Sequence, residues 1–251
     1  MPTFFTEGIV LSRTAVGDTD KSAVIYTDAH GKLTARVRAG QRSTSKLAGS
    51  IEPFSTGLFF FAQGRGGHTL TGADLTTTFP RLKSKLLTTA SASVIVECVL
   101  LLTHEWHADK RVLDIVKSAC AFLNQRTLTR GQVMIAEMWA LWQLLGHLGI
   151  GLNLDVCVRC GKKLDSRKLS ISYDQGGTLC ASCTESVRGS MPLSSAALKL
   201  LRLAGGMALR SIPRIRASAG TITQALKCAH GAYQYQLDQA SPALAFRNAV
   251  Q

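Results

Sequence analysis

Polar and apolar positions alternate along the first 80 residues with the two-residue period of β-strands. The clearest segment is 33–38, in which Leu, Ala and Val strictly alternate with Thr and Arg. Turns are predicted at His30–Lys32 and Gly64–Gly67. Apolar runs predict further strands over Gly8–Leu11, Ala23–Tyr26, Leu58–Phe61 and His68–Thr71. Five short strands in this length predict a small closed barrel, with the OB-fold as the leading candidate.

The period changes to that of helices after Pro80. Helices are predicted over 84–106, 111–123 and 133–148, and Gly149 and Gly151 end the third. Two more are predicted from Ser194 to about Leu209 and over about 221–237, with a loose end at Ser241–Gln251. The fold class is therefore α+β and multidomain. Its expected parts are a barrel over 1–80, a helical domain over 81–152 and 189–251, and a cysteine module inserted over 153–188.

Charge is the feature of the composition that changes this picture. The 251 residues carry 29 Lys and Arg against 16 Asp and Glu, a net charge of +13. The excess rises along the chain, from 8 basic and 6 acidic residues in 1–80, through 8 and 5 in 81–150, to 13 and 5 in 151–251. A basic excess of this size favours a polyanionic partner: nucleic acid first, an acidic membrane surface or acidic protein second.

The start of the chain indicates where the protein works. It has no basic segment followed by an apolar one, so no secretory signal is expected. The longest apolar run, Val94–Leu102, is interrupted by Glu97 and falls short of the ~20 residues of a membrane span. Seven cysteines in such a chain favour the reducing cytosol. We expect a cytoplasmic protein, associated with the nucleoid, without a membrane partner.

Four cysteines give the most specific chemical signal. Cys157, Cys160, Cys180 and Cys183 form two C-x₂-C pairs separated by 19 residues, the spacing of a tetrahedral zinc site with room for a hairpin. A disulfide pair and a redox C-x₂-C are the alternatives. The absent signal argues against the first, and the absence of a βαβ pattern argues against the second. We expect one structural Zn²⁺. The basic residues near the first pair suit phosphate binding and a solvated surface equally.

The predicted barrel carries a second set of candidates, which are basic. Barrels of this kind bind single strands along a positive groove, with bases stacked on aromatic rings. Phe59 or Phe61, whichever faces out, is a candidate platform, against the alternative that each packs in the core. The basic residues on one strand face and in the following polar loop are Arg36, Arg38, Arg42 and Lys46.

Motifs of enzymes are absent. The sequence has neither a G-x-x-x-x-G-K-[ST] phosphate loop nor a G-x-S-x-G elbow, and His104–His107 is one residue short of H-E-x-x-H. Asp18 and Asp20 are interpreted as a solvated turn. We expect a DNA-binding protein that is not an enzyme. Its rivals are a zinc-ribbon transcription factor that reads duplex sequence and a zinc-dependent enzyme with an open metal position.

Several strings resemble the RecO family of bacterial recombination mediators. They are Gly31–Gly40 (GKLTARVRAG), Ser45–Leu47, Ile51–Phe54 and Leu144–Asn153, which leads into the first cysteine. They occur in the family's order, so the resemblance covers essentially the whole chain. In one place the chain departs from the pattern. Gln41, Ser43 and Thr44 interrupt a loop that is often continuously basic in the family, so we expect weaker phosphate binding by this loop, with more of it shifted to the basic C-terminal half.

The resemblance implies a function. The family has an N-terminal OB-fold and a helical C-terminal domain, with a zinc motif in many members. It binds single- and double-stranded DNA, anneals complementary strands, works with RecR, and helps to load RecA on DNA coated by single-strand binding protein (SSB), whose acidic tail it contacts. The resemblance also implies zinc ligation by the four cysteines, and it implies that the DNA-facing set is Lys32, Arg36, Arg38, Arg42 and Lys46.

Overall fold

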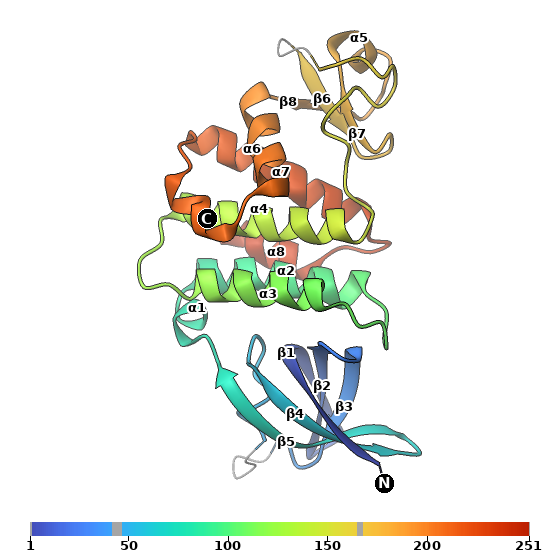
Figure 1. Cartoon of the computed structure of the whole chain (residues 1–251), viewed down its shortest axis with the longest axis vertical. Helices are drawn as coiled ribbons and strands as arrows, with labels where there is room; N and C mark the ends of the chain where they lie inside the picture. The colour runs from blue at the N-terminus through green and yellow to red at the C-terminus, as the bar shows by residue number, and fades with distance from the viewer. Residues whose placement is uncertain (1, 42–46, 165–167, 251) are drawn as a thin grey trace. The chain divides into compact units, whose positions relative to one another are not determined.

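The chain divides into two units, residues 1–125 and 126–251. The computed structural model in Figure 1 describes residues 2–41, 47–164 and 168–250. The N-terminal unit is built on a closed barrel whose strands are β1 (Thr3–Val16), β2 (Asp20–Thr27), β3 (Gly31–Val37), β4 (Thr56–Gly64) and β5 (Gly67–Thr77). β1 pairs with both β2 and β4, and a parallel pairing of β3 with β5 completes the ring. This is the predicted OB-like barrel.

The alternation in segment 33–38 places its side chains as predicted. Leu33, Ala35 and Val37 are buried in the barrel core, whereas Arg36 and Arg38 are exposed. The hairpin predicted at Gly64–Gly67 also forms, since these two glycines pair across the turn between β4 and β5. A two-residue period thus fixes which face of β3 meets the core and which face meets solvent.

The long helix predicted over 84–106 is broken at both ends. The structure has a short α1 (Pro80–Ser84), then α2 (Leu86–Leu102), and then α3 (Lys110–Leu123). After α2 the chain turns back along β3, where Glu105 forms isolated bridges with Gly31 and Lys32. Gly31 is required here, because its φ is +66° and a Cβ would lie 2.2 Å from the His107 carbonyl oxygen. The apolar pattern alone predicts a helix that continues to residue 106, but pairing of the chain with β3 ends α2 at Leu102.

The C-terminal unit packs helices around α4 (Arg130–His147). The partners of α4 are α6 (Ser195–Gly206), the 3₁₀ segment η1 (Leu209–Arg214) and α7 (Ala219–Tyr235). A capping box of Thr129 and Gln132 starts α4, and Gly149, with φ +76°, follows its end. Among the residues that the structure describes, we find no helix with the length and apolar character needed to cross a lipid bilayer.

The C-terminal segment, predicted to be loose, is helical. Helix α8 (Pro242–Ala249) is capped by Ser241, whose hydroxyl accepts the Leu244 N–H. Buried Arg247 donates from Nε to Oε2 of buried Glu137 on α4, at 2.7 Å. The local sequence could not reveal this helix, because a segment of eight residues is stabilised by its tertiary contacts rather than by helix propensity.

A small sheet module is inserted between α4 and α6. Strands β6 (Leu169–Ser172), β7 (Gly177–Leu179) and β8 (Met191–Leu193) form a sheet in the order β7-β6-β8, with the one-turn α5 (Ala181–Thr184) after β7. The β6–β7 hairpin occupies the gap between the two cysteine pairs, as the spacing predicts. The ring of Tyr173 lies against Gly231 of α7, where a Cβ would be 2.1 Å from the tyrosine oxygen, so the module rests on the helices.

Candidate nucleic-acid interface

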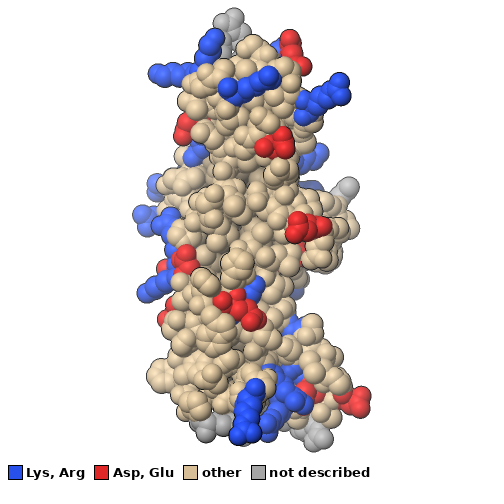
Figure 2. All heavy atoms as spheres, turned by 90° about the vertical axis from the view of Figure 1, so that its right-hand side faces the viewer, with Lys and Arg blue, Asp and Glu red and all other residues tan. Residues whose placement is uncertain are grey.

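A groove of about 500 Å³ lies between the end of β3 and the β4–β5 hairpin. Three exposed arginines line it, and no acidic side chain is among the described residues that do so. Figure 2 shows Lys and Arg side chains gathered on the barrel at the foot of the view. The three arginines of this basic groove are Arg36, Arg38 and Arg65. Three exposed cations along one groove suit the binding of successive phosphates of a nucleic-acid strand.

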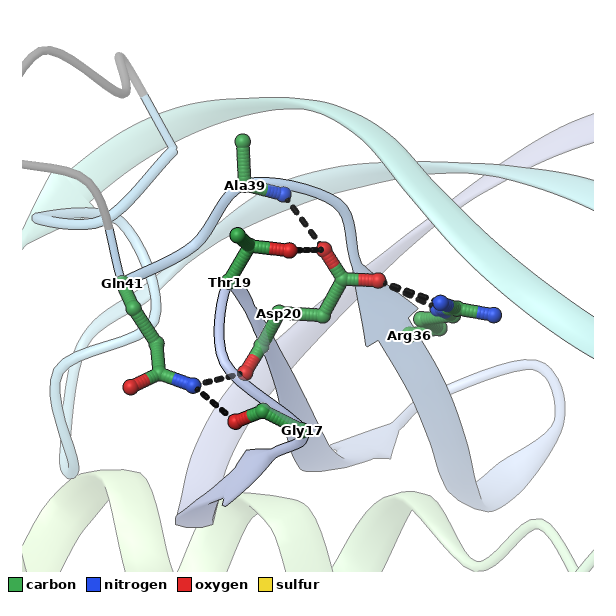
Figure 3. Close-up of polar contacts among 6 residues, drawn as sticks. All are labelled: Gly17, Thr19, Asp20, Arg36, Ala39 and Gln41. Carbon is green, nitrogen blue, oxygen red and sulfur yellow. Dashed lines mark hydrogen bonds and ion pairs between the residues drawn. The ribbon is translucent and has the colours of Figure 1, made fainter.

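Asp20 fixes the position of Arg36. Figure 3 shows the network: both Nε and Nη2 of Arg36 lie 2.6 Å from Oδ2 of Asp20. The other carboxylate oxygen accepts the Ala39 N–H at 2.8 Å and the Thr19 hydroxyl at 3.2 Å. Arg36 remains 63% exposed, so Asp20 orients the guanidinium without removing it from solvent. Asp20 itself is 7% exposed, so its interpretation as part of a solvated turn was wrong, whereas Asp18 is exposed as expected.

The same network anchors the turn that follows β3. The Gln41 side-chain amide donates to the carbonyls of Gly17 and Asp20, at 2.8 and 2.9 Å (Figure 3). The Ala39 N–H holds the pKa of Asp20 below its ordinary value, and the Arg36 guanidinium lowers it further. Asp20 is therefore ionised at neutral pH and keeps both contacts.

Lys32, the first member of the DNA-facing set that the resemblance implies, has another task in this structure. Its Nζ donates to the carbonyls of Leu100 and Thr103 at the end of α2. These are carbonyls that a helix C-terminus leaves without partners, and a cation there also complements the helix dipole. The pKa of Lys32 lies below its ordinary value because burial lowers it, and the nearby Glu105 carboxylate offsets only part of this effect. Lys32 is not among the residues that line the basic groove.

Two members of the predicted set, Arg42 and Lys46, lie outside the described residues. Arg65 is a groove residue that sequence reasoning missed, because the Gly64–Gly67 segment was interpreted only as a turn. The signal was available: an arginine at the tip of a hairpin between two barrel strands cannot be buried in the barrel.

Neither Phe59 nor Phe61 faces solvent. Both are 0% exposed and belong to the barrel core. The suggestion that one of them faces out was wrong for a geometric reason, since residues two apart on a strand share a face. The residue between them, Phe60, is half-buried, and its ring lies 6.0 Å from that of the exposed Phe5.

The four cysteines converge on one point of the module. Their Sγ atoms all lie within 4.8 Å of one another, and Cys160 and Cys180 are 3.8 Å apart at Sγ. A tetrahedral ion with metal–sulfur bonds of about 2.3 Å requires thiolates about 3.8 Å apart. The cluster therefore fits a four-thiolate metal site. Four protein ligands fill the tetrahedron, so such a site is structural and offers no position to a substrate.

Backbone hydrogen bonds shape the two knuckles that present the cysteines. In the first, the Cys157 N–H donates to the Lys162 carbonyl and the Gly161 N–H to the Cys157 carbonyl, at 2.9 and 2.8 Å. Gly161 has φ +72°, which glycine adopts without strain. In the second, Cys180 caps α5 and its carbonyl accepts the Cys183 N–H at 3.1 Å. Each knuckle thus brings two thiols to the same side of a tight turn.

A closed barrel with a basic outer groove, joined to a helical unit with a four-thiolate insertion, defines an OB-type nucleic-acid-binding class of protein. The chain matches the family model "Recombination protein O N terminal" over residues 1–79 and "Recombination protein O C terminal" over 83–244. The chain therefore belongs to the RecO family of DNA repair proteins.

Individual relatives agree with this assignment. The DNA repair protein RecO of Bacillus pumilus is 30% identical over 198 residues, which are 79% of this chain and 75% of the relative. The RecO of Roseiflexus sp. is 29% identical over 245 residues, covering 98% of this chain and 85% of the relative. The similarity thus extends across both units.

Proposed function

We propose that this protein is a recombination mediator that binds DNA, anneals complementary strands, and helps to load RecA onto SSB-coated single strands in the cytoplasm, at the nucleoid. The observation that carries the proposal is the basic groove of Arg36, Arg38 and Arg65 on an OB-like barrel. The role requires no chemical step. Arginines that neutralise phosphates release counterions and reduce the repulsion between two strands, which permits pairing.

The double substitution Arg36→Glu/Arg38→Glu tests this function. It should weaken single-strand binding and slow annealing of complementary oligonucleotides at ~0.1 M salt. Loss of two phosphate contacts should also reduce the slope of log affinity against log salt by about 1.4, given about 0.7 per contact on single strands. Fluorescence anisotropy over a salt series measures both quantities, and circular dichroism verifies the fold.

A variant with the same change of charge serves as the control. Arg81→Glu/Arg111→Glu reverses two exposed arginines on α1 and α3, outside the groove. Its affinity should stay close to that of the native protein. An equal loss in both double variants would place the effect in net charge rather than in the groove, and no loss in either would exclude the barrel as the DNA site.

Sequence specificity separates the mediator from a transcription factor. A site-specific factor prefers its site over random DNA by about 10³-fold or more. The mediator should depend on length, strandedness and salt alone. Competition with pooled random duplexes measures this difference, and strong enrichment of one sequence would support the transcription factor instead.

A second groove, on the helical unit, supports the partner assignment to SSB. It has a volume of about 730 Å³ and lies among α6, η1 and α7. Leu203, Met207 and Ile215 supply an apolar lining, while Lys199 and Arg214 are exposed at its margin. An acidic peptide with an apolar end complements both features. We assign the acidic C-terminal tail of SSB to this groove.

Charge reversal also tests this assignment. Lys199→Glu/Arg214→Glu should abolish binding of a fluorescent SSB-tail peptide and slow annealing on SSB-coated DNA, with and without RecR, while annealing of bare DNA stays unchanged. Arg188→Glu/Arg210→Glu reverses two exposed arginines elsewhere in the unit and is the matched control. Unchanged peptide affinity in the first variant would place the SSB contact elsewhere.

The metal of the cysteine site is zinc in this proposal, one ion held by Cys157, Cys160, Cys180 and Cys183. Two C-x₂-C pairs in a small sheet module are the usual ligand set of structural zinc. X-ray absorption at the zinc edge should detect four sulfur ligands. A coordinated oxygen or nitrogen would instead favour a catalytic zinc site.

A further inference from the structure

A cluster of aromatic rings lies beside the basic groove. His68 lines the groove, and its ring centroid is 4.9 Å from that of Trp106. His30 lies 6.0 Å from Trp106, and Phe4 lies 4.7 Å from His30 and 5.8 Å from His68. Phe4 in turn stacks on Phe61 of the barrel core at 5.2 Å. The rings therefore connect Trp106 to the rigid interior of the barrel.

Trp106 is exposed in spite of these contacts. The residue keeps 51% of its accessible surface, which is unusual for a large apolar ring that could pack in a core. Its neighbour His68 is held by ring contacts. The Nε2 atom of His68 is buried, and no partner for it occurs in the described part of the chain. The cluster thus presents an indole to solvent on a support made of other rings.

The backbone of Trp106 is held in a costly conformation. Its φ is +63°, in the left-handed region that non-glycine residues rarely adopt. The Trp106 N–H donates to the Lys32 carbonyl at 3.3 Å, and the preceding Glu105 accepts from the Thr34 hydroxyl at 2.8 Å. Strain that the surrounding contacts maintain is a feature of binding sites, because it fixes a side chain before the ligand arrives.

The position of the Trp106 indole beside the basic groove indicates that its ligand is an unpaired base. Single-stranded DNA binds to barrels with phosphates along a basic groove and bases stacked on aromatic rings. Here His68 belongs both to the groove of Arg36, Arg38 and Arg65 and to the support of Trp106. A strand whose phosphates follow the arginines therefore brings an unpaired base to the indole. A duplex cannot do this, because its bases are already stacked inside the helix.

We propose that Trp106, supported by His30 and His68, is a stacking site for a base of single-stranded DNA, which makes the barrel bind single strands more tightly than duplex. This inference rests on the proposed function, because it takes the basic groove as the path of the phosphates. It adds the residue that distinguishes an unpaired base from a paired one, a distinction that charge cannot make.

Trp106→Ala tests the stacking site. Its affinity for a short dT oligonucleotide should fall roughly 5- to 150-fold, the range for loss of one base–aromatic stack. Its affinity for a duplex, and for an abasic oligonucleotide of equal length, should not change. Trp106→Phe retains a ring and should recover most of the affinity. An equal loss for all three ligands, or no loss for dT, would overturn the proposal.

Phe5→Ala is the matched control. Phe5 is 65% exposed on the same barrel but outside the groove, so its removal should leave dT affinity unchanged. A loss in Phe5→Ala without one in Trp106→Ala would place stacking at Phe5 and overturn the assignment. If Arg36→Glu/Arg38→Glu weakens dT binding but Trp106→Ala does not, the stacking site alone fails. If the arginine variant has no effect, the groove itself fails.

Fluorescence gives a measurement that does not depend on removing Trp106. The chain has three tryptophans, so Trp139→Phe/Trp142→Phe leaves Trp106 as the sole indole. Saturating dT should quench its emission, whereas the abasic oligonucleotide, which has the same phosphates and no bases, should not. Equal emission with and without dT, at a concentration where anisotropy shows binding, would contradict the stacking site.

Discussion

Each unit contains an arginine–carboxylate ion pair, and the two pairs differ in burial. On the barrel, Arg36 is 63% exposed, and its ion pair with Asp20 leaves part of the guanidinium free for a ligand. In the helical unit, Arg247 and its partner Glu137 are buried, and His230 lies 2.6 Å from the second oxygen of the same carboxylate. An exposed, oriented cation can bind phosphate, whereas a buried one is already committed to the fold. The net charge of a chain therefore does not show which basic residues can bind a ligand until the burial of each residue is known.

Removal of one ligand of the proposed metal site should have the largest effect, and that effect should be confined to the C-terminal unit. Cys157→Ser should lower the metal content from about one ion per chain to almost none, because a site with three thiolates binds far more weakly. Segment 153–188 should then lose its protection from hydrogen exchange, while the barrel keeps its protection and its affinity for DNA. Elemental analysis and exchange mass spectrometry measure the two results.

Cys228→Ser is the control for this change, since Cys228 is buried on α7 and lies outside the cysteine cluster. It should keep the metal. A Cys157→Ser protein that retains its ion and its melting temperature would show that the cluster is not a metal site.

Loss of the buried ion pair should have the next largest effect. Arg247→Met leaves the Glu137 carboxylate buried without its guanidinium partner, which should lower the free energy of unfolding by about 3–5 kcal/mol. Helix α8 should detach first, because this pair attaches it to α4. Arg210→Met, at an exposed position on η1, should cost less than about 0.5 kcal/mol. Denaturant titration measures the free energy of unfolding of both variants. Equal losses in the two would contradict the contrast between buried and exposed arginines.

Acid should weaken the helical unit through the same pair. Burial by itself raises the pKa of Glu137, but the His230 hydrogen bond and the Arg247 guanidinium outweigh burial and hold it below its ordinary value. The carboxylate therefore stabilises the fold above the unfolded pKa, at about 4.3, and this contribution is lost as the pH falls through the lower, folded pKa. The stability difference between the native protein and Glu137→Gln should shrink over this range. A difference that is constant down to about pH 3 would contradict the assignment.

The smallest effect is expected at the Arg36–Asp20 pair of the barrel, in which the guanidinium is exposed and the carboxylate is not. Asp20→Asn removes the charge that holds Arg36 and one negative group from beside the groove. Single-strand affinity should rise by up to about fivefold, the range of an ion pair with a partner at the surface. Asp18→Asn, at an exposed position in the same turn, should change it less. Reduced affinity in Asp20→Asn would mean that orientation of Arg36 contributes more than the removal of a competing carboxylate.

Local patterns predicted the barrel well, because each of their rules acts over a few residues. Alternation placed Arg36 on the outside of β3 and Arg38, directly after the strand, at the surface as well, and the Gly64–Gly67 turn formed between β4 and β5. The cysteine spacing predicted a cluster, and the structure gathers all four Sγ atoms within 4.8 Å of one another. The alternation of side chains along a strand and the geometry of a C-x₂-C knuckle both depend on a few neighbouring residues, so the local sequence predicts them.

By itself, the sequence determined the order of the parts, the inward and outward faces of β3, and the convergence of the four cysteines. Only the tertiary structure decided that Lys32 caps α2, that Arg65 joins Arg36 at one groove, that Trp106 stands beside His68, and that Arg247 is buried on Glu137. The physical reason is the same in each case. These contacts join residues far apart in the chain, and the environment of a charge or ring depends on neighbours that no local period specifies.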